Sequence, residues 1–141
     1  MSIELDVQWP YVFTRFDGTQ TLAELDAYIA RMDVEVHRRR QPYVGVTYLK
    51  QYNRDKPVVE RMQKWMAATD SFTREHCVAI AMVNSSAGFR FLLSAIFLIQ
   101  SMPCPYDVCG TFAEALTFVR KHATKRGLAL ADARRPWSDL P

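Results

Sequence analysis

The residues best suited to chemistry lie in one short segment, 84–90, which reads Asn-Ser-Ser-Ala-Gly-Phe-Arg. It follows an apolar run of strand length and precedes a helical pattern, so Ser85 and Ser86 fall at the start of a helix. Free amide hydrogens at a helix start favour anions, so this turn could hold a phosphate or carry one covalently. Serines are also ordinary helix caps, and the same pattern describes a cap without a ligand. The candidate anion or phosphorylation site comprises Asn84, Ser85, Ser86 and Arg90.

Three cysteines, Cys77, Cys104 and Cys109, are the other reactive side chains that stand out. Cys104 and Cys109 are close enough in sequence to offer two thiolates to a metal ion. A structural zinc site requires four ligands, and the further candidates are His122 and the distant His76 beside Cys77. We therefore predict reduced thiols that pack as small core side chains, with no bound metal and no other cofactor.

The sequence predicts no catalytic site. Its five glycines never cluster into a phosphate-binding loop, and no predicted strand end carries paired carboxylates. A nucleophilic Cys/His pair would need an orienting third group, and none can be identified. Residues 38–40, three arginines at a predicted helix end, either complement the helix dipole or contact an anionic partner or lipid headgroup. We interpret the chain as a non-enzyme.

Alternating strand and helix patterns supply the framework that would position these residues. The predicted strands span residues 3–7, 11–16, 43–49, 77–83 and 106–110, with a turn at Asp17-Gly18. Four helices are predicted. Two begin at capping boxes, at 21–24 and 111–114, and end near residues 39 and 126. The other two begin at Pro57 and at the serines 85–86, and end near residues 69 and 99. This order predicts an α/β fold: a single four- to five-stranded, mostly parallel or mixed sheet with about four helices. We expect one domain over residues 1–127 and a C-terminal tail over 128–141.

The third predicted helix lacks the polar side that a surface helix normally has, because no charged residue occurs between Phe91 and Tyr106. Spacing at 100° per residue places Arg90, Ser94, Phe97 and Ser101 on one polar-leaning stripe, with Leu93 and Leu98 on its shoulders. We expect Leu92, Ala95 and Ile99 to pack on the sheet, which leaves Phe97 pointing outward. Phe97, Leu93 and Leu98 are then a candidate interface with another protein or a second copy. The alternative is that Trp137 of the tail covers Phe97.

Two motifs resemble those of the anti-sigma-factor antagonist (STAS) domains. The segment 84–89 with Leu92-Leu93 resembles their Asp-Ser-Ser-Gly-Leu-Gly…Leu-Leu signature, and Val108 with residues 111–116 is similar to their closing strand and helix. Residues 16–21 also look like those of STAS/SEC14-like bacterial proteins. Asn84 stands where the family has Asp, Ala87 stands where it has its first Gly, and the helix after Pro57 is additional. The resemblance, over residues 11–127, implies a sheet with helices, no cofactor, and regulatory protein–protein contact switched by phosphorylation at Ser85 or Ser86.

Composition and charge exclude some classes of partner and location. The 141 residues are 49% hydrophobic and 23% charged, with a net charge of +3 spread along the chain, which argues against a nucleic-acid binder. The longest apolar run is too short to cross a bilayer, so no integral membrane segment is expected. An odd, low cysteine count and the absence of a signal-peptide pattern favour a cytoplasmic location.

We therefore expect a STAS-like, non-catalytic regulatory domain that binds another protein or itself. The alternative is a small-molecule or lipid carrier or sensor, with its ligand at the carboxyl edge of the sheet.

Overall fold

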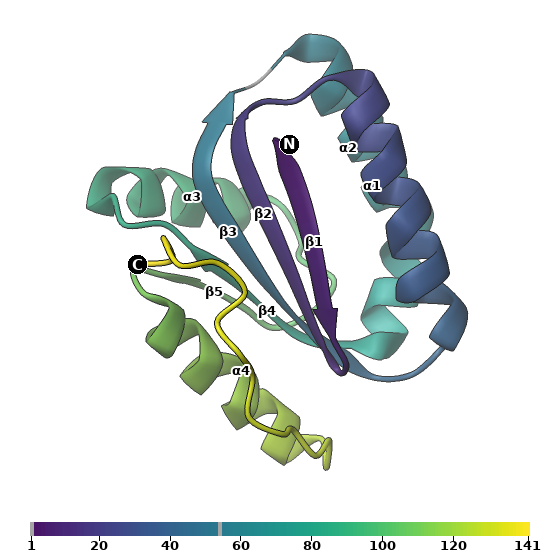
Figure 1. Cartoon of the computed structure of the whole chain (residues 1–141), viewed down its shortest axis with the longest axis vertical. Helices are drawn as coiled ribbons and strands as arrows, with labels where there is room; N and C mark the ends of the chain where they lie inside the picture. Colours follow the sequence, from purple (N-terminus) through teal and green to yellow (C-terminus); the bar gives the residue numbers. More distant parts are fainter. Residues whose placement is uncertain (1, 54) are drawn as a thin grey trace.

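The chain folds around one five-stranded mixed sheet. The computed structural model describes residues 2–53 and 55–141. The strands are β1 (Ile3–Gln8), β2 (Tyr11–Thr19), β3 (Tyr43–Asn53), β4 (Cys77–Val83) and β5 (Tyr106–Cys109), and they lie in the sheet in their chain order. β1 is antiparallel to β2, and all other neighbours are parallel (Figure 1). The predicted α/β class and largely parallel sheet are confirmed.

The helices form a layer on each face of the sheet. They are α1 (Leu22–Glu35), α2 (Lys56–His76), α3 (Ala87–Ile99) and α4 (Phe112–Lys125). Because parallel crossovers share one hand, the three helices that connect sequential strands lie on one face. α4 and the yellow C-terminal segment lie on the opposite side from α1 and α2 (Figure 1). In the described part of the chain, no helix has the length and apolar character needed to cross a membrane.

On the first face, local signals and burial agree. Thr21 caps α1 as the capping box predicts, because its hydroxyl accepts from the backbone N–H of Glu24 at 3.1 Å. Leu25 of the helix is fully buried against the sheet. The Tyr28 hydroxyl is also buried and shares a hydrogen bond of 3.3 Å with Thr14 of β2, so the polar group is satisfied.

On the second face, small side chains bring helix and sheet close together. Ala115 and Val119 of α4 are fully buried in the same cluster as Ala79 and Ala81 of β4. Short side chains on both surfaces allow the helix axis to approach the strand, which keeps the layer well packed. The helix covers β4, β5 and part of β3.

Residues 128–141 cover the rest of that second face without forming a helix. Leu140 is buried, and Trp137 packs partly buried against the same cluster. The Tyr11 hydroxyl donates to the Ala131 carbonyl at 2.9 Å, and the Gln8 side chain pairs with the Arg134 backbone through two bonds of 2.8 and 3.0 Å. These contacts satisfy backbone groups that have no ladder partner in this segment.

Four predicted boundaries are wrong. Asp17-Gly18 is not a turn: β2 continues to Thr19, with a bulge between Phe16 and Asp17 and with Gly18 at φ +78°. A bulge and a turn share the glycine signal, because both need a positive φ. The first helix stops at Glu35 and gives way to a 3-10 turn over His37–Arg39, while β3 and α2 run longer than predicted, to Asn53 and His76.

Candidate functional site

The turn between β4 and α3 contains the residues that the sequence marks as a candidate anion or phosphorylation site. Ser86 is the N-cap of α3, and its hydroxyl accepts from the Phe89 backbone N–H at 3.3 Å. The cap interpretation of the serines is therefore confirmed for Ser86. Ser85 and Ser86 are both exposed, so a modifying enzyme can reach either hydroxyl.

Asn84 stabilises this turn through three hydrogen bonds. Its side-chain amide donates to the Leu49 carbonyl of β3, and its Oδ1 accepts from the Ser86 backbone N–H at 2.8 Å. Its own backbone N–H donates to the Cys109 carbonyl of β5 at 3.0 Å. The residue thus ties three strands to the start of α3, and its polar groups are already engaged within the protein.

Arg90 lies beside the same turn, but its guanidinium faces protein rather than a ligand position. Its Nη1 donates to the Asn84 carbonyl at 2.8 Å. The group packs so closely on Gly110 that a Cβ there would lie 3.1 Å from Nη1. The structure brings all four predicted residues together, with Arg90 committed to the backbone and the two serine side chains facing solvent.

Four of the seven exposed large hydrophobic residues in the described part of the chain lie on α3, and the predicted orientation of this helix is wrong. Leu93 is buried, and Phe97 is half-buried with its ring 5.2 Å from the Tyr106 ring, edge to face. The residues expected to pack inward, Leu92 and Ile99, are instead exposed to 53% and 88%. Of the three candidate interface residues, only Leu98 is exposed, at 85%. Apart from Arg90 and Ser94, every side chain of α3 is apolar or glycine, so the periodicity does not distinguish which apolar side faces the sheet.

We call the outward stripe Phe91, Leu92, Leu98 and Ile99 the α3 surface. Phe91 is 78% exposed. Phe91 and Leu98, like Leu92 and Ile99, are seven residues apart, so the two pairs lie on one side of the helix. Ala95, half-buried, lies between them. The tail does not cover this stripe, because Trp137 belongs to the core cluster on the opposite face of the sheet.

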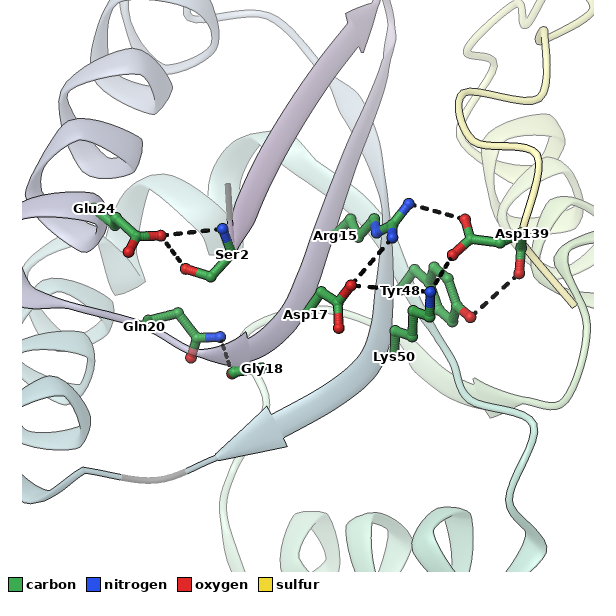
Figure 2. Close-up of polar contacts among 9 residues, drawn as sticks. All are labelled: Ser2, Arg15, Asp17, Gly18, Gln20, Glu24, Tyr48, Lys50 and Asp139. Carbon is green, nitrogen blue, oxygen red and sulfur yellow. Dashed lines mark hydrogen bonds and ion pairs between the residues drawn. The ribbon is translucent and has the colours of Figure 1, made fainter.

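A cluster of charges around Asp139 was not anticipated from the sequence. Its carboxylate accepts from Arg15 Nη1 of β2 at 2.8 Å and from Lys50 Nζ of β3 at 2.7 Å (Figure 2). Its backbone carbonyl accepts from the Tyr48 hydroxyl at 3.3 Å, and Arg15 also pairs with Asp17. The bond from Lys50, with the nearby Arg15 charge, lowers the pKa of Asp139. The cluster fastens the tail to the sheet.

Two more features bear on ligands. The three cysteines are unpaired, and the sulfur of Cys104 lies against that of Cys77. Within residues 2–53 and 55–141, no group of three His, Cys, Asp or Glu side chains is arranged to hold a metal ion.

A groove of about 560 Å³ runs along β1, between Arg31 of α1 and Arg134, Arg135 and Trp137 of the tail. It lies along the edge strand rather than at the carboxyl ends of the parallel strands.

Comparisons with protein-family models, with curated proteins and with solved structures gave no match to this chain. The local motifs and the geometry of α3 are therefore the grounds on which a function can be proposed.

Proposed function

We propose that this chain is a non-catalytic regulatory interaction domain that self-associates through the α3 surface. The observation that carries the proposal is the exposure of Phe91, Leu98 and Ile99, each more than three-quarters open to solvent. Removing one such side chain from water contributes about 1.5–3 kcal/mol, so a patch of this kind favours a partner.

The size of the patch suits a second copy of the chain. Four side chains at about 100 Å² each present roughly 400 Å² of apolar surface. A standard interface buries about 800 Å² on each partner, with an apolar core and a polar rim. The α3 surface therefore supplies the core of a dimer interface of ordinary size.

The charge pattern favours self-association over a membrane surface. Helices that bind bilayers carry Lys and Arg on the side facing the headgroups, whereas α3 contains only Arg90, whose guanidinium is bonded to the Asn84 carbonyl. A two-fold axis brings identical surfaces together, and like charges would repel there. No charge between Phe91 and Tyr106 opposes that pairing, and the small Ala95 lets two helices approach.

The test is the mass of the full chain in solution across a range of concentrations. We expect the wild type to approach twice its 16.3 kDa, and Leu98→Glu to remain monomeric with an unchanged circular dichroism spectrum. Val34→Glu is the matched control, because Val34 is 53% exposed on α1 and should leave the dimer intact. A monomeric wild type, or a dimeric Leu98→Glu, would contradict the proposal. So would a monomer that binds anionic vesicles through Leu98.

Ser85 supports a regulatory role in this proposal, together with the STAS resemblance of its segment. It lies less than two turns before Phe91, so a phosphate there would place charge at the edge of an apolar contact. We expect Ser85→Glu to weaken dimerisation several-fold and the neutral Ser85→Asn to leave it unchanged. Ser85 is preferred for this test because Ser86 caps the helix. Equal dimerisation of the two variants would exclude Ser85 as the switch.

A further inference from the structure

Two cysteines that are distant in sequence meet in the core. Cys77 begins β4 and Cys104 lies in the connection between α3 and β5, 27 residues later, yet their sulfur atoms are 3.7 Å apart. Cys77 is 1% exposed and Cys104 is 9% exposed. A disulfide needs the sulfurs at about 2.05 Å, a closure of less than 2 Å. Cys104 lies in a loop, where the backbone can follow that movement.

The surroundings give the two sulfurs different characters. The hydrogen bond with Cys77 and the positive charge of Arg74 lower the pKa of Cys104, in spite of its burial. The hydrogen bond with Cys104 and burial raise the pKa of Cys77. Cys104 is therefore the more readily ionised and the more accessible thiol, and the Cys77 sulfur lies within reach.

We propose that Cys77 and Cys104 form an oxidisable dithiol, a modification site that is oxidised by hydrogen peroxide and closes to an intramolecular disulfide. The Cys104 thiolate attacks one peroxide oxygen, the O–O bond breaks, and the leaving hydroxide takes a proton to become water. The Cys77 sulfur then attacks the resulting sulfenic sulfur, the S–O bond breaks, and the hydroxide leaves with the Cys77 proton as a second water. The two thiols lose two electrons and two protons, and one peroxide is reduced to two waters.

Cys109 provides an internal control. Burial, together with the nearby Asp107 carboxylate, raises the pKa of Cys109 to about 12, which keeps it as an unreactive thiol. It is therefore expected to survive a peroxide dose that consumes the other two. The inference concerns the chemistry of the core and does not depend on self-association through the α3 surface.

The experiment treats the reduced full-length chain with hydrogen peroxide, alkylates the remaining thiols, and maps the peptides without reduction. We expect titratable thiols to fall from three to one per chain, with a Cys77–Cys104 cross-linked peptide and an alkylated Cys109. Cys109→Ser should still lose two thiols, and Cys104→Ser should lose none to an intramolecular disulfide. Glutathione in a parallel tube without the protein confirms that the peroxide is active.

Several results would overturn the inference. They are three alkylated cysteines after the glutathione is oxidised, a cross-link through Cys109, a bond between chains, or a Cys104 that ends as sulfinic acid without a cross-link. Because Cys77 is buried, its substitution can unfold the chain. The Cys104 and Cys109 variants are therefore the decisive pair, with circular dichroism as the check on folding.

Discussion

Helices α3 and α4 begin in the same way, but their outward faces differ in polarity. Each follows one of two neighbouring parallel strands, begins at a hydroxyl N-cap and spans 13 or 14 residues. α4 buries one stripe and carries its charges, such as Glu114, Arg120 and Lys121, on the other side. α3 buries Leu93 and leaves an equally apolar stripe in water. The N-caps help both helices to form. The outward-facing residues determine whether a helix leaves an apolar surface that a second chain could cover.

The largest effect should come from matched phenylalanines on the two helices. Phe112 of α4 is buried and packs 5.8 Å from the Phe13 ring, whereas Phe91 of α3 is exposed. We expect Phe112→Ala to lower the free energy of unfolding by about 3–5 kcal/mol. Phe91→Ala should change it by less than about 0.5 kcal/mol under conditions where the chain is monomeric. Urea unfolding of dilute protein measures both, and similar losses would remove the contrast between the helices.

The second effect concerns the two caps. Thr111 accepts from the Glu114 N–H at 3.2 Å, as Ser86 does from Phe89. Thr111→Ala should lower the free energy of unfolding by about 1 kcal/mol. Ser86→Ala should lower it by less, because α3 has little buried surface and its first turn can open locally. Hydrogen exchange at the two helix starts distinguishes local from global opening. A larger global loss from Ser86→Ala would show that α3 is integral to the fold.

The smallest effect we expect is on pH dependence. Burial lowers the pKa of His37, and burial with Lys125 and Lys121 lowers the pKa of His122 on α4. The unfolded chain takes up protons near pH 6.5, before the folded chain does, so stability should fall as the pH drops from 7 toward 5.

The α3 surface has no titratable side chain between Phe91 and Cys104, so dimerisation should be constant between pH 6 and 7.5. Chemical unfolding and solution mass across this range test the two statements. His122→Gln should flatten the dependence of stability on pH, and a dimer that dissociates in parallel with the loss of stability would contradict the separation.

Much of the fold could be predicted because its signals are local. The capping boxes at Thr21 and Thr111 and the apolar run Cys77–Val83 each specify an element through neighbouring residues. Strand alternation between helices then specifies the sheet. The bulge at Asp17 could not be distinguished from a turn, because Gly18 satisfies both.

The contacts that build the sites could not be predicted in the same way. Asp139 contacts Arg15 at a sequence separation of 124 residues, and Cys104 contacts Cys77 at a separation of 27. No local sequence pattern predicts either contact. The predicted rotation of α3 is wrong because a helix with only two polar side chains, Arg90 and Ser94, has apolar residues on more than one side that could face the sheet. In contrast, the residues of the turn at 84–90 are adjacent in the chain, and their proximity follows from the sequence itself.

The way residues 128–141 lie across the sheet has a consequence for synthesis of the protein. The segment reaches Tyr11 and Gln8 over 120 and 126 residues, and it is made after every strand that it covers. While the ribosome still holds it, the aromatic side chains of β2 on that face remain open to water, although β1 to β4 can already pair. A nascent chain in this state exposes an apolar strip of the kind that chaperones bind and that promotes aggregation. This face of the sheet is therefore covered late, when residues 128–141 become free to pack on it.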